Sequence, residues 1–359
     1  MLNDFGIKII KWYEKNKRSL PWRNTSDPYK IWLSEVILQQ TRVEQGKEYY
    51  RRFVSRFPDI FSLEGAGQDE IYKMWQGLGY YNRANNLMEA AKTIVNDFQG
   101  VFPENPEELI QIKGIGPYTA AAISSIAFNY PQAVVDGNVF RVLSRIFDIS
   151  TPINTGKGKK EFECLAGELM LKKQAGTFNQ AVMEFGALYC KPRNPDCAAC
   201  IFFNDCLAAR QNKVEKLPVK TNKIAVKNRY FNYLFIELFK DEKSSFYLKQ
   251  RDRKDIWKNL YDFPMLESKK RLDPDAVLES KMFKSLFSGL NFRLKSVSVE
   301  YLHQLTHQKI HAVFLRIIVD KNFKQLSEKP LLLVDENKLI HYPVPRLLER
   351  YLQDQEILK

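Results

Sequence analysis

Four of the five cysteines lie in one short stretch, and their spacing constrains this part of the fold more than any other feature of the sequence. They are separated by six, two and five residues and are Cys190, Cys197, Cys200 and Cys206. Pro192 and Pro195 in the first spacer favour turns over a continuous helix, so the four thiolates can converge on one metal centre. Structural zinc usually uses two short C-x2-4-C knuckles, and only one is present, so the spacing favours a [4Fe–4S] cluster over zinc. Cysteines that only pack in a core are the remaining alternative.

The chain is strongly basic. Its 359 residues include 55 Lys and Arg against 42 Asp and Glu, a formal net charge of +13, which favours a polyanionic partner. No segment approaches the roughly 18 uninterrupted apolar residues of a membrane span, and the start of the chain shows no secretory signal pattern. Metal-binding thiolates and an unpaired Cys164, which we expect in a helix core, indicate a reducing compartment.

The apolar periodicity changes along the chain, which predicts two domains. Residues 1–211 are predicted to be helical, with helical spacing over residues 31–40, 70–75, 83–98, 107–112, 118–128, 139–146 and 159–171. Ser26-Asp27-Pro28 is a helix start signal. A polar, basic stretch at 212–228 predicts a linker. The last domain, residues 229–359, is predicted to be α+β, with strand patterns at 230–239, 245–250 and 311–319 and helical patterns at 274–290 and 345–352.

A glycine-containing turn joins two apolar helical patterns at residues 109–120. Gly114 and Gly116 flank Ile115 in this turn. Glycines allow a tight hairpin whose backbone N–H groups, with the N-terminus of the next helix, can approach a phosphate closely. On its own such a turn is a weak signal, but with the basic charge and the cysteine loop it favours DNA binding by a helix-hairpin-helix element.

Together, the hairpin, Asp136-Gly137-Asn138 after it, and the cysteine loop resemble the helix-hairpin-helix DNA glycosylase superfamily in its iron–sulfur branch. Further segments resemble adenine DNA glycosylases of the MutY type, namely residues 20–23, 32–41, 77–81 and 178–184. The resemblance implies an all-α glycosylase domain carrying a [4Fe–4S] loop, followed by a Nudix-like α+β domain. It also implies a monomeric bacterial enzyme, associated with the nucleoid in the cytoplasm, that binds duplex DNA. Its reaction would be the removal of adenine mispaired with 8-oxoguanine or G in base excision repair.

Two carboxyl groups suit this chemistry. Glu35 interrupts an apolar helix pattern, so its carboxyl is expected to be poorly solvated and its pKa raised. A protonated acid near neutral pH can assist the departure of adenine by protonating N7. Asp136 precedes a helix start, where the dipole and unpaired N–H groups stabilise a carboxylate that can face an oxocarbenium-like sugar. The alternatives are a Glu on a solvated helix edge and an Asp that serves only as a cap.

Position 118 separates two related activities. Endonuclease III-type relatives, which are glycosylases and AP lyases, carry a lysine here that can form a Schiff base with the sugar. This chain has Tyr118, which favours a monofunctional glycosylase in which Tyr118 and Asn138 position Asp136 and the sugar. The endonuclease III-like activity, a non-catalytic iron–sulfur DNA-binding protein and a redox-sensing regulator stay open as alternatives.

The resemblance also implies how the lesion is found, because a base inside a duplex must be flipped out to react. Trp22, Arg23, Leu38 and Glu184 would line the adenine pocket, while Gln40, Thr41, Leu78 and Tyr80 would act at the 8-oxoguanine. In the last domain, residues 255–264 resemble the W-x-x-L-x-x-F-P element, with Lys258 and Asn259 in place of its usual glycines. No Nudix hydrolase box is present. Leu305-Thr306-His307 would be the damage-reading loop, in which Thr306 could accept a hydrogen bond from N7–H of the lesion and His307 completes the pair.

Overall fold

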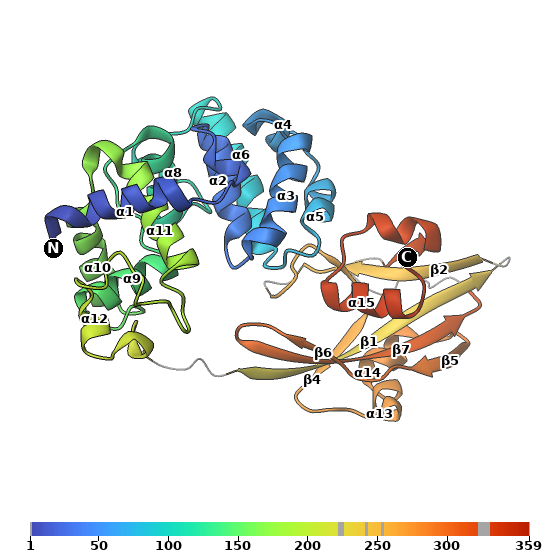
Figure 1. Ribbon diagram of the computed structural model, residues 1–359. Helices are drawn as coiled ribbons and strands as arrows, with labels where there is room; N and C mark the ends of the chain where they lie inside the picture. Colours follow the sequence, from blue (N-terminus) through green and yellow to red (C-terminus); the bar gives the residue numbers. More distant parts are fainter. Residues whose placement is uncertain (1, 222–225, 241–242, 253–254, 322–330, 359) are drawn as a thin grey trace. The chain divides into compact units, whose positions relative to one another are not determined.

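The structure is a computed structural model that describes residues 2–221, 226–240, 243–252, 255–321 and 331–358. It forms two compact units, residues 1–66 with 83–222 and residues 67–82 with 223–359 (Figure 1). Part of the predicted 212–228 linker, residues 222–225, lies outside the described residues. Among the described residues, no helix is both long and apolar enough to cross a membrane.

The first unit is helical, as predicted. Its helices are α1 (Leu2–Asn16), α2 (Pro28–Leu38), α3 (Val43–Arg56), α4 (Ile60–Glu64), α6 (Asn82–Phe98), α7 (Pro106–Leu109), α8 (Pro117–Phe128), α9 (Gly137–Phe147), α10 (Gly156–Leu169), α11 (Ala175–Leu188) and α12 (Leu207–Arg210) (Figure 1). The start signal at residues 26–28 is confirmed, because the Asp27 side chain accepts from the Tyr29 N–H and Pro28 begins α2. The helix predicted at 107–112 is a single turn. Cys164 is exposed on α10, so the prediction that it lies in a core is wrong.

Two packing arrangements place the site of the first unit. Helix α2 packs against α3 and α8, and α11 packs against α1, α8 and α9. Most of α2 is buried, including Ile31, Trp32, Leu33, Val36 and Ile37. A helix with apolar side chains on all sides is stable only inside a core. Glu35 is therefore held at the interior of the unit by its apolar neighbours.

The second unit is built on a mixed sheet of order β3-β2-β1-β7-β5, in which β4 pairs with β1, β6 with β7 and β8 with β2. The central strands β1 (Lys227–Lys240) and β7 (Gln308–Val319) are parallel, and the other pairs are antiparallel. The remaining strands are β2 (Lys243–Gln250), β3 (Tyr261–Asp262), β4 (Met265–Ser268), β5 (Phe292–Val297), β6 (Tyr301–Gln304) and β8 (Leu332–Asp335). The predicted strand segments are thus confirmed and extended.

Alternating side chains of β1 enter cores on both faces of this sheet. Phe231, Tyr233 and Phe235 pack in the core that includes α15 (Arg346–Asp354), whereas Leu234 and Ile236 pack on the other face. That second core includes α13 (Pro274–Leu278) and α14 (Lys281–Leu286). The helical pattern predicted at 274–290 corresponds to these two short helices, which are separate because Ser280 leaves the helical conformation and caps α14. The second unit also includes α5 (Gln68–Trp75).

Candidate active site

A cavity of about 240 Å³ in the first unit brings together side chains from distant parts of the chain. Glu35 reaches it from α2, and Tyr118, in the first turn of α8, donates a hydrogen bond to Glu35 Oε2 at 2.9 Å. Burial raises the pKa of Glu35 to about 7, against the opposing effect of this hydrogen bond. The carboxyl is therefore close to half protonated at neutral pH.

Asp136 lies in the same cavity at the start of α9. Its Oδ1 accepts from the backbone N–H groups of Asn138 and Val139 at 2.8 and 2.7 Å, and its Oδ2 accepts from Asn138 Nδ2 at 2.7 Å. These bonds favour the carboxylate, as expected at a helix N-terminus, but burial outweighs them and the net direction of the pKa is upward. Tyr118, predicted to position Asp136, instead donates to Glu35.

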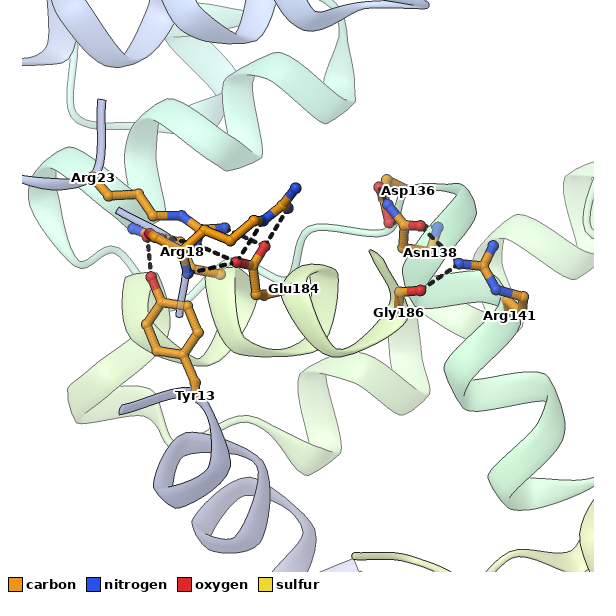
Figure 2. Close-up of polar contacts among 9 residues, drawn as sticks. Tyr13, Arg18, Arg23, Asp136, Asn138, Arg141, Glu184 and Gly186 are labelled. Atoms are coloured by element: carbon orange, nitrogen blue, oxygen red, sulfur yellow. Dashed lines mark hydrogen bonds and ion pairs between the residues drawn. The ribbon is translucent and has the colours of Figure 1, made fainter. Parts of the chain in front are cut away.

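Glu184 of α11 differs from Glu35 in that its carboxylate is paired with cations. Arg18 and Arg23 both approach its two oxygens, with contacts of 2.5–2.9 Å (Figure 2). Although burial opposes ionisation, these arginines lower the pKa of Glu184 to about 2. The charge pair fixes one wall of the cavity, because a forked guanidinium and a carboxylate have matching planar geometry.

Arg141 of α9 connects the Asp136 turn to the cysteine loop. Its guanidinium donates to Asn138 Oδ1 at 2.8 Å and to the Gly186 carbonyl at 2.7 Å (Figure 2). It also donates to the Cys190 carbonyl at 2.8 Å. At Gly186 a Cβ would come within 2.6 Å of the Asn138 Cβ, so α11 passes close to the turn. Through Arg141, α9 therefore contacts both the Asp136 turn and the backbone of Cys190.

The four predicted metal ligands line a second cavity of the first unit. All are free thiols. Arg145 donates to Cys190 Sγ and the Phe202 N–H donates to Cys200 Sγ, both at 3.4 Å. Among the described residues, no group of three or more His, Cys, Asp or Glu is arranged to hold a metal ion. The donor set, four thiols with N–H groups directed at sulfur, nevertheless fits a thiolate-ligated cluster in its chemistry.

The residues predicted to act at the lesion occupy loop tips and a separate pocket. Gln40 and Tyr80 are exposed non-glycine residues with φ of 56° and 49°, a conformation that persists only where the surroundings impose it. Leu78, Tyr80, Thr306 and His307 line a pocket of about 340 Å³ in the second unit, where the Tyr80 and Thr306 hydroxyls are hydrogen-bonded. Thr41 lines the Glu35 cavity instead.

The comparisons with known proteins agree along most of the chain. The family described as "HhH-GPD superfamily base excision DNA repair protein" matches residues 33–167, and the NUDIX domain matches residues 236–354. "Adenine DNA glycosylase" of Buchnera aphidicola subsp. Acyrthosiphon pisum is 30% identical over 98% of this chain and 97% of its own. The chain belongs to the adenine DNA glycosylase family. The predicted fold class, family and enzyme class, a DNA glycosylase, are thereby confirmed.

Further relatives extend the agreement. "Adenine DNA glycosylase" of Homo sapiens is 38% identical over 59% of this chain and 41% of its own. Among solved structures, "Structure of a thermostable thymine-DNA glycosylase" is 32% identical, with a TM-score of 0.54, over 58% of this chain and 95% of that chain. "Structure of a non-covalent Endonuclease III-DNA Complex" has a TM-score of 0.50 at 19% identity, over 58% of this chain and 94% of that chain, and supports the fold alone.

The two hairpin glycines differ in what the backbone requires of them. Gly114 has a φ of 95°, and a Cβ there would come within 2.6 Å of the Asn86 Cβ, so this position needs glycine for the turn itself. Gly116 caps α8 with an ordinary φ of −88°, and a Cβ there would meet nothing within 4 Å. Gly116 therefore leaves open space at a helix N-terminus, where a phosphate could approach.

The structure gathers most of the predicted adenine-pocket residues but adds one that sequence reasoning missed. Trp22, Arg23, Leu38 and Glu184 line the Glu35 cavity, and so does Arg18. Arg18 stands two residues before the Leu20–Arg23 motif. No local sequence pattern predicts the role of Arg18, because its partner Glu184 is 166 residues away in the sequence.

Proposed function

We propose that the chain hydrolyses the N-glycosidic bond of adenine mispaired with 8-oxoguanine, or with guanine, in duplex DNA. The observation that carries this proposal is one cavity in which a carboxyl of pKa about 7 and a strongly hydrogen-bonded carboxyl are both present. Base departure needs a proton donor and a group that tolerates positive charge on the sugar. The relatives named adenine DNA glycosylase support adenine as the base.

In the proposed mechanism Glu35 supplies the proton. With a pKa near 7, a large fraction of Glu35 carries a proton at neutral pH and can transfer it to N7 of an adenine held in the cavity. Protonation makes the purine a neutral leaving group. Tyr118 holds Oε2 through its hydroxyl and so leaves the other oxygen, Oε1, for the base.

Asp136 then faces the sugar. Its carboxylate is anchored by three N–H donors, so it can stabilise oxocarbenium character at C1′ without moving. Water adds to C1′ and completes the hydrolysis. None of the described residues that line the cavity is lysine, which supports a monofunctional reaction over a Schiff-base lyase.

The remaining predicted residues take supporting roles. Trp22, Arg23, Leu38 and Glu184 surround the flipped adenine. Gln40 intercalates beside the 8-oxoguanine, Thr41 contacts it, and Tyr80 wedges into the adjoining step with Leu78 nearby. Gly114 and Gly116 approach a phosphate. Residues 1–211 would form the catalytic domain and 229–359 the 8-oxoguanine-reading domain, with 212–228 as linker. Thr306, beside His307, accepts from N7–H of 8-oxoguanine. The net charge of +13 supports binding to duplex DNA. The chain would act as a monomer in the nucleoid-containing cytoplasm.

The four cysteines would hold a [4Fe–4S] cluster, which supplies a fixed cross-link between the loop and the helical domain rather than a step of the reaction. Arg141 of α9 then connects the loop's backbone to the Asp136 turn, and Arg145 of the same helix donates to the Lys191 carbonyl in the loop. Protein purified without oxygen should be yellow-brown, absorb broadly near 400 nm and contain about four irons per chain. A colourless protein carrying one zinc would overturn the cluster and leave the glycosylase proposal standing.

The activity is tested by single-turnover excision on duplexes that carry 8-oxoguanine:A, G:A or thymine glycol. We expect adenine release from the first two, fastest from the first, and none from the third. Borohydride should trap no covalent complex, because no amine attacks the sugar. Asp136→Asn should lower excision by at least about 10² while lesion DNA still binds, and Glu163→Gln on exposed α10 is the control. Release of thymine glycol with a trapped adduct would favour the endonuclease III-like alternative.

A further inference from the structure

A network of ion pairs lies beside the pocket of the second unit; Arg229 and Asp262 are buried, Arg251 and Asp255 are half-buried, and Glu267 is exposed. Arg229 of β1 is 7% exposed. It pairs with Asp255 and Glu267, and Arg251 pairs with Asp262 and Asp255. The residues that line the pocket include Ile256, Trp257, His303, Thr306 and Gln308. The network adjoins the pocket, because Asp255 directly precedes Ile256 and Gln308 accepts a hydrogen bond from Arg229.

Arg229 uses every donor it has. Its Nε–H and both Nη groups make five hydrogen bonds of 2.7–2.9 Å, two to Asp255, two to Glu267 and one to Gln308 Oε1. A guanidinium has five N–H donors in a fixed plane, and a lysine ammonium has three on a flexible stem. Only arginine at this position can make all five bonds at once.

Two partners of Arg229, Asp255 and Gln308, belong to different segments of the chain that contribute to the pocket. Asp255 directly precedes Ile256 and Trp257, while Gln308 begins β7 and follows the Leu305-Thr306-His307 loop. Trp257 has a φ of 60°, which a bulky side chain adopts only when its surroundings hold it there. The held ring meets the His303 ring edge-to-face at 5.5 Å. Asn259, where the family element usually has glycine, has a φ of 69°, a conformation that asparagine tolerates.

We propose that Arg229 is a positioning residue for lesion recognition, which preorganises the pocket by joining the Asp255–Trp257 turn to the strand that carries Gln308. The inference rests on the proposed function, because it assigns the pocket to reading of the lesion base. Buried ion pairs add little net stability compared with apolar contacts of the same size. The five-bond arrangement holds the Asp255–Trp257 turn and the Gln308 strand together before DNA binds. Less conformational entropy is then lost on binding.

The test compares Arg229→Lys with Arg293→Met, an exposed arginine of β5 in the same sheet. The measured quantity is the ratio of single-turnover excision rates for 8-oxoguanine:A and G:A in the full chain, well below its unfolding temperature. Arg229→Lys keeps the charge but cannot make the five bonds in one plane, so we expect the ratio to fall several-fold. Hydrogen exchange should also increase in residues 255–263. The control should change neither quantity.

Gln308→Leu provides a variant that spares both carboxylate pairs and should fold whatever happens to the lysine variant. It removes one of the five bonds, and we expect the ratio to fall by about two- to threefold. Because both changes act on one arrangement, the double variant should lose no more than Arg229→Lys alone. An unchanged ratio in both single variants would overturn the inference, even if their melting temperatures fell. A wild-type ratio near one would instead overturn the lesion-reading proposal, and this inference with it.

Discussion

Two glutamates in the same cavity have opposite ionisation behaviour. Glu35 is held by an apolar helix and has one hydroxyl partner, and burial raises its pKa to about 7. Glu184 is less than 2% exposed, yet two arginines lower its pKa to about 2. Burial opposes ionisation in both cases. The difference in pKa therefore comes from Arg18 and Arg23, which hydrogen-bond to Glu184.

This contrast explains how one cavity can hold both an acid and an anchor. A proton donor must sit in a desolvated place where no cation directly pairs with it. A structural anion needs the reverse, because a buried carboxylate without partners would be protonated or expelled. Arg23 reaches toward both groups electrostatically, but its hydrogen bonds go to Glu184. The hydrogen bonds of both Arg18 and Arg23 to Glu184 therefore separate the two roles.

The largest expected effect comes from removing the acid. Glu35→Gln keeps the shape and the Tyr118 contact but cannot transfer a proton in the same way, so single-turnover excision should fall by at least about 10². Binding of lesion DNA should persist. For the unchanged enzyme, excision should decline as the pH rises through about 7, because the donor is lost. Normal excision rates in Glu35→Gln would show that Glu35 is not the proton donor.

The second prediction concerns stability, where the two glutamates should respond with opposite sign. Glu35 has a folded pKa above its unfolded value, so its stability contribution is present below about pH 4.5 and lost as the pH rises through about 7. At pH 8, Glu35→Gln should therefore stabilise the chain by an amount on the order of 2 kcal/mol. The gain should shrink as the pH falls toward 4.5.

Glu184→Gln should destabilise at pH 8 by a similar amount, because its folded pKa lies below the unfolded one. Its contribution is present above about pH 4.5 and lost as the pH falls through about 2. The change also leaves Arg18 and Arg23 without their shared anion. Urea-unfolding midpoints at pH 8 and pH 5 measure both variants, with the exposed Glu163→Gln as control. The same sign for both variants would show that the arginines do not set the difference.

The environment of Glu35 could be predicted from the sequence better than that of Glu184. Apolar neighbours on both sides of Glu35 sit within one helix, so local pattern was enough to expect a poorly solvated carboxyl and the helix that carries it. The pairing of Glu184 with Arg18 joins positions 166 residues apart, and no local periodicity encodes such a contact. For Asp136 the capping bonds were foreseeable from the helix start, but the depth of burial that outweighs them was not.

The second unit shows the same limit. Aromatic and β-branched residues along β1 and β7 predicted strands, and most of β1 is buried without alternation because both faces of the sheet are covered. The buried position of Arg229 was not predictable, since a charged residue at the start of a strand resembles an exposed edge until its partners are known. Its partners Asp255, Glu267 and Gln308 lie 26, 38 and 79 residues away. The burial and partners of a lysine or arginine near a motif therefore become known only from the fold.

The smallest expected effect tests the hydroxyl that tunes the acid. The Tyr118 hydrogen bond lowers the pKa of Glu35 against the larger effect of burial. One hydrogen bond contributes about 1 kcal/mol net, so Tyr118→Phe should move the alkaline limb of the excision–pH profile upward by up to about one unit. At pH 6, where the acid is already protonated, the rate should change by less than about threefold if positioning survives. Tyr130→Phe, at a surface tyrosine, should leave the profile in place. A limb that stays at the wild-type pH in Tyr118→Phe would mean that burial alone sets the Glu35 acid, and a limb that moves downward would mean that the phenol stabilises its protonated form.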